Sequence, residues 1–424
     1  MIIKGNRANS IGIVENRRVS ISFLLEWIAL GVAFLMPLVF WPASEQPFSA
    51  AKEWLLAVWI LTGFALGAAG GLMRRKLPAG AIAAAAIWII AVSLSAGTGD
   101  EASIHEFVWH LLPCAGFLLL LWIGIRPQRL VLALIFSGTM VALVALLQFV
   151  RLDPFLLLNL TGSSHGTPRM RIFSTLGNPN FVAALLTVIL PLTVFCPQTG
   201  IRISPAIWRV FQIGGGLIQA SAIVATGSRA PILGFIAVGI WFLSRKFKFR
   251  LRFVFTGLAI CAILILLSPA RPLEKTISGR LYIWRIIGAR ISDIPLAGYG
   301  PGAFPLRFAQ WETDYIRANP DDSDRVFFGL QDHAHNDYVE IMVDYGIVGL
   351  AAFLAVIALS IPLLYRRDRS LLADAIAASI IALLAVAMVD FPLHRPAELY
   401  LFWTQLALLW IVGENILVSN SKLS

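Results

Sequence analysis

The sequence predicts an all-α protein that crosses a membrane many times. Of its 424 residues, 58% are hydrophobic and only 14% are charged, whereas an ordinary soluble domain has about 25% charged residues. The apolar residues fall in long uncharged runs, for example 181–196, 253–270 and 351–364. With their flanks such runs reach about 20 residues, which matches the hydrocarbon thickness of a bilayer. A soluble fold is excluded because only a membrane accommodates so many helices that are apolar on every side.

About twelve transmembrane helices are expected, within a single integral membrane domain that covers residues 1–424. The predicted spans are 20–41, 54–73, 79–96, 106–125, 129–150, 178–197, 207–227, 230–244, 252–269, 338–364, 371–391 and 397–415. The basic start of the chain precedes the first span without a convincing small-residue cleavage site, so we expect this span to be retained instead of removed as a signal peptide. An even number of spans places both termini on one side.

The charges between the spans predict which side this is, because short cytoplasmic loops collect Lys and Arg. Basic residues precede the first span and follow the second, fourth, sixth, eighth and tenth. All of these segments fall on the same side of the membrane. We therefore expect both termini to be cytoplasmic.

Two segments on the opposite side depart from this pattern, 151–177 and the long stretch 270–337 before the tenth span. Together they carry Arg151, Arg169, Arg171, Arg271, Lys275, Arg280, Arg285, Arg290, Arg307, Arg317 and Arg325. Long segments can be translocated despite their charge, so the topology stands. The basic residues indicate either attraction to lipid phosphates or a site for an anionic substrate. Nucleic acid is a poor candidate, because no interleaved aromatic motif accompanies them. We expect the two segments to cap an active site.

The sequence gives no indication of a metal site or a disulfide framework. The cysteines Cys114, Cys196 and Cys261 lie in apolar runs without CxxC or histidine spacing. The acidic run 321–324 has the ligand type for a divalent cation, but such a run is more typical of a solvated loop. We expect no metal and no other cofactor.

The segment 333–338, His-Ala-His-Asn-Asp-Tyr, joins the long stretch to the tenth span. Asn336 is a candidate N-cap, and Asp337 and Glu340 in the first turn would suit the positive end of the helix dipole. His335 then lies at the mouth of the helix, near the outer membrane interface. A helix N-terminus disfavours the imidazolium form, so a neutral histidine that accepts a proton is reasonable there. We expect His333 to be a supporting hydrogen-bonding residue.

Nine residues separate Asn336 from a glycine pair, so the segment reads H-N-x9-G-x-x-G. Gly346 and Gly349 are three apart and would lie on one helix face, where they permit close approach of a neighbouring helix. The whole string resembles the signature of the O-antigen ligase and O-antigen polymerase superfamily, which also includes bacterial O-linked oligosaccharyltransferases. In that superfamily an acidic residue, more usually Glu, stands two positions before the first glycine, and here Asp344 fills this position.

Three further segments are similar to those of the superfamily. They are 227–231, Gly-Ser-Arg-Ala-Pro, which contains Arg229; 279–284, which begins Gly-Arg and contains Arg280; and 171–180, which contains Arg171 and Asn180. A glycine-rich run follows the second of them at 298–302. The resemblance covers roughly residues 169–415, and the first five spans match only in being hydrophobic. It implies a fold like that of the GT-C glycosyltransferases.

The resemblance also implies a reaction. Enzymes of this kind take a glycan from undecaprenyl diphosphate on the periplasmic side of the bacterial inner membrane and transfer it to an acceptor hydroxyl with inversion. Arg229, Arg280 and Arg171 would bind the diphosphate and stabilise the negative charge that grows on it. His335 would remove the acceptor proton, with Asn336, His333, Asp344 and Asn180 in support. The closest match is O-antigen ligase, whose acceptor is the lipid A-core oligosaccharide, and membrane lipids would surround the enzyme.

Other functions stay open at this point. A repeat-unit polymerase or a protein O-oligosaccharyltransferase would share the donor chemistry and differ in the acceptor. A transporter for lipid-linked glycans would also use many spans and outer arginines, and two inverted halves would favour it. The sequence shows no internal repeat.

Overall fold

The computed structural model describes residues 21–70, 76–98, 103–158, 172–198, 203–244, 263, 273–364 and 370–420. All regular structure in these ranges is helical. The predicted all-α, polytopic membrane fold is therefore confirmed. Every predicted span except the ninth contains a helix; the ninth, 252–269, lies outside the described residues apart from residue 263.

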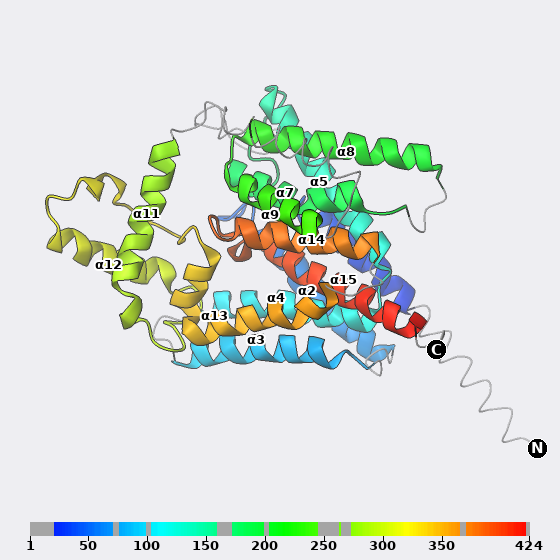
Figure 1. The fold of residues 1–424 in the computed structure, drawn as a ribbon, viewed down its shortest axis with the longest axis horizontal. Coiled ribbons are helices and arrows are strands. Elements are labelled where there is room, and N and C mark those ends of the chain that lie inside the picture. Colours follow the sequence, from blue (N-terminus) through cyan, green and yellow to red (C-terminus); the bar gives the residue numbers. More distant parts are fainter. Residues whose placement is uncertain are drawn as a thin grey trace, which may run out of the picture.

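Most of the helices run side by side in one bundle (Figure 1). Six described helices are long and apolar enough to cross a membrane: α2 (Ala50–Ala69), α3 (Ala79–Thr98), α4 (Ile104–Ile123), α5 (Pro127–Phe149), α8 (Pro205–Thr226) and α13 (Asp337–Leu364). Shorter apolar helices are Ile21–Leu35, α7 (Pro179–Phe195), α9 (Ala230–Ser244) and α14 (Leu371–Val386), and α15 (Pro396–Asn420) completes the bundle. These helices pack around a continuous buried apolar core.

Local sequence explains where several helices begin and end. The side chain of Asn178 accepts a hydrogen bond from the Asn180 backbone N–H at 2.9 Å, and Pro179 occupies the first turn of α7. Such an N-cap satisfies a backbone donor that the helix itself leaves unpaired, and proline is tolerated at the first position. At the other end of α8, Gly227 has a φ of +62°, the left-handed conformation in which helices often stop.

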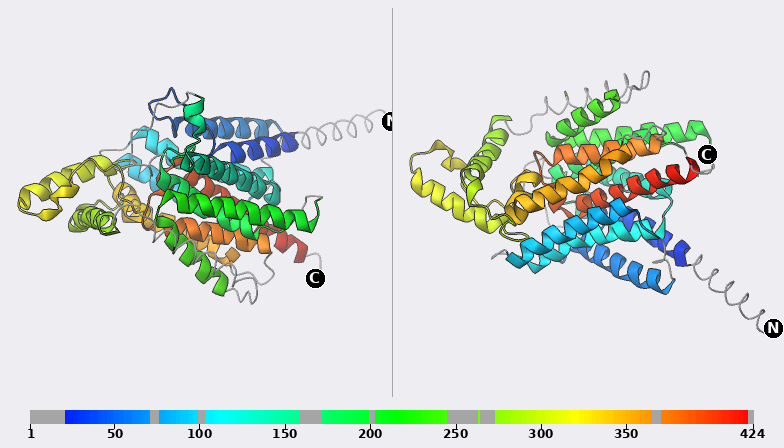
Figure 2. Two further views of the ribbon diagram at one scale, coloured as in Figure 1. Left: turned by 90° about the horizontal axis from the view of Figure 1, so that it is seen from above. Right: turned by 60° about the horizontal axis from the view of Figure 1, so that its bottom comes forward.

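Two helices lie beyond one end of the bundle, α11 (Leu273–Ala289) and α12 (Phe304–Ala318) (Figures 1 and 2). The first described helix begins, and α15 ends, at the opposite end. A separate group of buried apolar side chains joins Tyr282 and Ile286 of α11, Phe308 of α12 and Val343 of α13. Much of the stretch 270–337 is therefore helical and packed, and its helices lack the long apolar runs by which the other helices are predicted.

The stretch between α11 and α12 docks onto a kink in α13. At Gly346 the backbone has φ +65° and ψ −169°, which interrupts the helix. The interruption leaves backbone groups without helical partners, and the 296–300 loop supplies new ones. Tyr299 N–H donates to the Val343 carbonyl at 3.1 Å, Gly300 N–H to the Asp344 carbonyl at 2.9 Å, and Val348 N–H to the Leu296 carbonyl at 3.1 Å.

The neighbours of the two glycines in the predicted motif therefore differ from those of the expected helix–helix contact. A Cβ atom at Gly346 would lie 2.1 Å from the Leu296 carbonyl oxygen, so the close neighbour is the backbone of a loop. At Gly349 a Cβ atom would lie 2.0 Å from the Cβ of Tyr345 in the same helix. The physical reason for the difference is the kink. It interrupts α13 at Gly346, and the 296–300 loop, instead of a helix, approaches the backbone there.

Candidate active site

The segment that carries His335 is held in place by a helix cap and by a backbone hydrogen bond, both at residues that directly follow His335. Asn336 caps α13 as predicted, since its side-chain oxygen accepts from Tyr338 N–H at 3.0 Å and from Val339 N–H at 3.2 Å. Asp337 N–H donates to the Ala387 carbonyl at 2.9 Å, which ties the segment to the end of α14. His335 itself has a φ of +52°. Left-handed backbone is uncommon for a residue other than glycine, and it marks a position that its surroundings determine.

Behind His335 lies a set of two histidines and two carboxylates, here called the buried cluster: His333, Asp337, Glu340 and His394. His394 Nδ1 lies 2.7 Å from Asp337 Oδ1, and His394 Nε2 lies 3.5 Å from Glu340 Oε1. Glu340 also binds His333 Nδ1 at 2.7 Å and accepts from Ala334 N–H at 2.8 Å. Asp337 and Glu340 lie in the first turn of α13, as predicted, and both are buried, so they make these contacts inside the protein.

His394 supplies the positive charge of the buried cluster. It lies in the short 3-10 helix η5 (Pro392–His394), between α14 and α15. Burial alone would lower its pKa, but the carboxylates of Glu340 and Asp337 outweigh this and raise the pKa of His394 to about 10. His394 is therefore an imidazolium at neutral pH, and it compensates carboxylates that could not otherwise be buried in ionised form.

Replacing His394 with glutamine should destabilise the protein by about 3 kcal/mol, because loss of one partner leaves buried charge uncompensated. A raised pKa gives stability that is fully present below about pH 6.5 and is lost as the pH rises through about 10. The difference in melting temperature between wild type and His394→Gln should thus persist at neutral pH and shrink only near pH 10. His105→Gln, at an exposed histidine, is the control; an equal loss there would contradict the assignment.

Arg280, Asp390 and His335 act on one another electrostatically. Burial lowers the pKa of His335, and the Arg280 guanidinium lowers it further, while the Asp390 carboxylate opposes both. The same carboxylate acts on Arg280. His335 also packs edge to face on Phe391, with 5.3 Å between ring centroids. His335, Arg280 and Asp390 are thus within electrostatic reach of one another.

Arg395 fixes the 390–395 segment that forms one wall of this site. Its guanidinium is buried, 3.2 Å from Asp390 Oδ2 and 3.5 Å from Glu398 Oε1. It also lies over the rings of Phe181 and Phe391, at 4.3 and 5.1 Å from their centroids. In the sequence, Arg395 is a single basic residue between two apolar runs. Nothing in the local pattern distinguishes a buried arginine from an exposed one.

The positions of three other predicted site residues relative to His335 are less closely defined. Arg229 directly precedes α9, where Ala230 packs with Val386 and Val389, so its backbone lies at the same end of the bundle as Asp390. Asn180, in the first turn of α7, is at this end too, next to the Phe181 ring that Arg395 covers. Arg171 lies outside the described residues.

Asp344 acts at a distance from His335. Its carboxylate accepts from Gly302 N–H at 3.0 Å and from Phe304 N–H at 2.9 Å, at the start of α12. Ser95 of α3 donates to the Asp344 carbonyl at 2.6 Å. Asp344 therefore caps a helix that belongs to another part of the chain. It holds α12 and the glycine-rich loop against α13.

The acidic run 321–324 is engaged in ordinary side-chain and turn contacts. Asp324 pairs with Arg285 at 2.6 Å, and Asp322 accepts from the Asp324 backbone N–H at 2.8 Å. Across the described part of the chain, no group of three or more His, Cys, Asp or Glu side chains is arranged to hold a metal ion.

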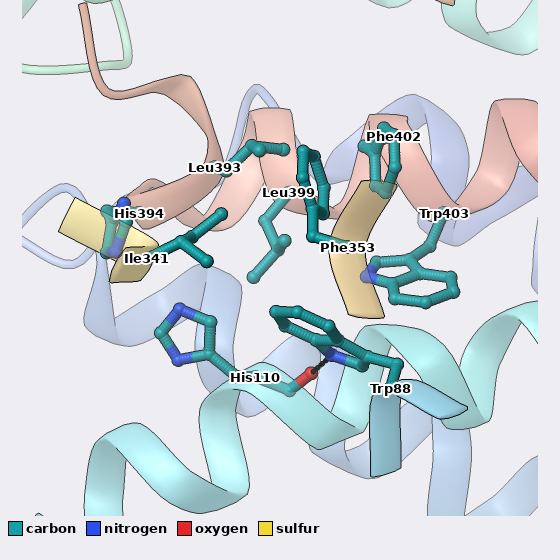
Figure 3. A pocket seen from close by; sticks show the side chains of 9 residues that line it. All are labelled: Trp88, His110, Ile341, Phe353, Leu393, His394, Leu399, Phe402 and Trp403. Carbon is teal, nitrogen blue, oxygen red and sulfur yellow. Dashed lines mark hydrogen bonds between the residues drawn. The ribbon is translucent and has the colours of Figure 1, made fainter. Parts of the chain in front are cut away.

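A small internal cavity lies deeper in the bundle than the buried cluster (Figure 3). Figure 3 shows His110 and His394 at one side and Phe402 and Trp403 at the other. The two imidazole centroids are 5.4 Å apart, and Trp88 Nε1 donates to the His110 carbonyl at 3.1 Å. The remaining lining is apolar. The cavity therefore borders the buried cluster at His394.

Comparison with known proteins gives a family match and a similar protein. Residues 215–354 match the sequence model of a family described as O-antigen ligase. The exopolysaccharide production protein ExoQ of Rhizobium meliloti (strain 1021) is 29% identical over 167 residues, which are 34% of this chain and 36% of ExoQ. The chain thus matches about a third of the length of that relative. Arg229, Arg280 and His335 all fall inside the range matched by the family.

Proposed function

With this match confirming the predicted resemblance to the O-antigen ligase and polymerase superfamily, we propose that the protein is a glycosyltransferase. It transfers a glycan from undecaprenyl diphosphate to a hydroxyl of the lipid A-core oligosaccharide, at the periplasmic face of the bacterial inner membrane. The observation that supports the proposal is the electrostatic interaction between His335 and Arg280, two residues that fall within the matched range. The orientation follows from the positive-inside distribution of charge, with both termini cytoplasmic.

In this proposal His335 is the general base. Its lowered pKa, caused by burial and by the Arg280 guanidinium, keeps the imidazole neutral and able to accept a proton near neutral pH. The acceptor oxygen attacks the anomeric carbon with inversion, and the bond from that carbon to the phosphate oxygen breaks. The electron pair stays on the diphosphate. Arg280 stabilises the charge that develops there, with Arg229 and Arg171 as further ligands of the diphosphate.

Replacing Arg280 with glutamine should reduce turnover about 100-fold, the usual cost of removing one preorganised group that stabilises transition-state charge. The KM for the lipid-linked donor should also rise, because guanidinium contacts to phosphate oxygens exist before the reaction. Arg280→Lys should recover part of the loss, since it keeps charge without paired hydrogen bonds. Arg317→Gln is the matched control, at an exposed arginine near the end of α12. Equal kinetics of the Arg280→Gln and Arg317→Gln proteins would exclude a phosphate role for Arg280.

The reaction itself is tested with purified protein in lipid vesicles. Undecaprenyl diphosphate-linked glycan is supplied with one of three acceptors: lipid A-core oligosaccharide, a second lipid-linked glycan, or a serine-rich peptide. Transfer to lipid A-core is the expected result. Movement of the donor across the bilayer without transfer to any acceptor would identify a transporter and overturn the proposal.

One finding favours a second candidate, a repeat-unit polymerase. The similar protein ExoQ is by its name an exopolysaccharide production protein, and its 167 matched residues are a part of the chain comparable to that matched by the ligase family. A polymerase uses the same donor chemistry and accepts on a second lipid-linked glycan. Lengthened lipid-linked products in the vesicle assay, without transfer to lipid A-core, would select this alternative.

A further inference from the structure

A second imidazole, that of His333, contacts the same Phe391 ring as His335 and differs from His335 in its hydrogen bonding. His333 Nδ1 is 2.7 Å from Glu340 Oε1, and the His333 side chain is 30% exposed while that of Glu340 is 3% exposed. The buried carboxylate thus binds the Nδ1 atom of His333, whose side chain as a whole is partly accessible. A carboxylate in this position fixes the tautomer with the proton on Nδ1, so Nε2 presents a lone pair.

Glu340 is itself held by several donors. Its second oxygen, Oε2, accepts from Ala334 N–H at 2.8 Å, and His394 Nε2 lies 3.5 Å from Oε1. The carboxylate is therefore preorganised beside His333, and it stabilises a positive charge there when His333 takes up a second proton. A histidine oriented and stabilised by a buried carboxylate is the arrangement that hydrolases use for their general base.

His335 has no such partner. Its Nδ1 is buried and makes no hydrogen bond within the described part of the chain. The guanidinium of Arg280 and the ring of His333 both disfavour a positive charge on it, and Asp390 and Glu340 only partly offset this. A proton that His335 removes from a substrate is thus poorly stabilised where it first arrives.

The two imidazoles contact one aromatic ring, that of Phe391. His333 stacks on Phe391 with 3.9 Å between centroids, and His335 packs on the same ring edge to face at 5.3 Å. The electrostatic influence of His333 on His335 is unfavourable when both are charged. Within the described part of the chain, the ring of His333 contacts a carboxylate and the Nδ1 atom of His335 does not.

We infer that His333 is a second catalytic residue, which receives from His335 the proton of the acceptor hydroxyl and holds it beside the Glu340 carboxylate. The inference rests on the proposed transfer reaction. The hydroxyl O–H bond breaks as the bond from oxygen to the anomeric carbon forms. The proton passes to His335 and then, through a water molecule, to His333 Nε2, and the bond from carbon to the phosphate oxygen breaks with its electron pair on the diphosphate. His335 is neutral again at the end, and His333 releases the proton to water. Glu340 is a positioning residue in this scheme.

The test is the transfer assay with His333→Ala and added imidazole. We expect kcat to fall about 100-fold, within the usual range for loss of a proton-transfer group, with KM for donor and acceptor unchanged. Because the His333 side chain is partly exposed, free imidazole should enter the space and restore a measurable part of kcat in a concentration-dependent way. Imidazole should leave the wild type and the control His105→Ala unaffected. A purely structural role would not produce this rescue.

Glu340→Gln is the companion variant. It keeps the shape and an acceptor for Ala334 N–H but removes the charge, so kcat should fall with unchanged KM, and imidazole should not rescue it. His333→Gln supplies a second truncation in case the alanine variant does not fold. Near-normal kcat in folded His333→Ala or His333→Gln, or loss in His333→Ala without rescue, would overturn the inference while wild-type transfer still supported the proposed function. Absence of transfer by the wild type would overturn both.

Discussion

Replacing His335 with asparagine should reduce glycan transfer about 10²- to 10⁴-fold, the range expected when a general base is removed. Binding of the lipid-linked donor should be unchanged, because in the proposed mechanism His335 contacts the acceptor hydroxyl and Arg280 contacts the diphosphate. The measurement is turnover at saturating substrate, with donor binding determined separately on the same purified protein. Unlike the loss at Arg280, the whole effect should appear in kcat.

The backbone at His335 decides which substitution is informative. Its φ of +52° is costly for alanine, by about 1 to 2 kcal/mol, but asparagine adopts this conformation more readily. His335→Ala therefore removes the imidazole and adds strain, whereas His335→Asn removes the imidazole alone. Both variants should be equally inactive, and the asparagine variant should have the higher melting temperature. Near-normal turnover by His335→Asn would remove His335 from the mechanism.

The helical bundle could be predicted from sequence because its signals are local. Apolar runs of bilayer length need no information about distant residues, and the Asn336 cap depends only on neighbours two and three positions away. The same holds for the Asn178 cap of α7. Each of these features is written in a few consecutive residues, so its physical cause can be recognised before the fold is known.

The contacts that build the site are not local. His394 and Asp337 are 57 positions apart, and Arg395 is buried only because Asp390, Glu398 and two aromatic rings surround it. A histidine between two apolar runs has no pattern that announces such partners. The helices α11 and α12 were missed for a related reason. They are too polar to resemble spans, and their burial depends on packing against each other and α13.

The glycines of the predicted motif have a different structural role from the one that their spacing suggests. Glycines three apart suggested close packing of two helices. In the structure Gly346 is a kink, and its closest neighbours are backbone atoms of Leu296 and Gly298. Gly298, with φ +76°, is equally tight, since a Cβ atom there would lie 2.3 Å from the Asp344 carbonyl oxygen. The two chain segments thus meet backbone to backbone, and this contact joins the 296–300 loop to the helix that carries His335 at its start.

Gly346→Ala is accordingly expected to have the largest effect on folding of any single methyl group added to α13. A left-handed φ costs alanine about 1 to 2 kcal/mol. The added Cβ would also lie 2.1 Å from the Leu296 oxygen and 2.4 Å from Gly298 N, and backbone atoms cannot turn aside as a side chain can. The loop must separate from α13, which breaks the hydrogen bonds made by Tyr299, Gly300 and Val348. The total loss should exceed about 4 kcal/mol, a size reached by few point mutations.

Melting temperature and yield of folded protein in detergent measure this loss, and turnover measures its consequence for the site. Gly67→Ala is the matched control, because Gly67 is also a buried helix glycine but a Cβ atom there would meet nothing within 4 Å. It should leave stability unchanged or slightly improved, since alanine is the better helix former. Wild-type stability of Gly346→Ala would show that the kink and its loop can relax without cost. Lost turnover in a folded Gly346→Ala protein would instead show that the loop contact positions α11, and with it Arg280, against His335.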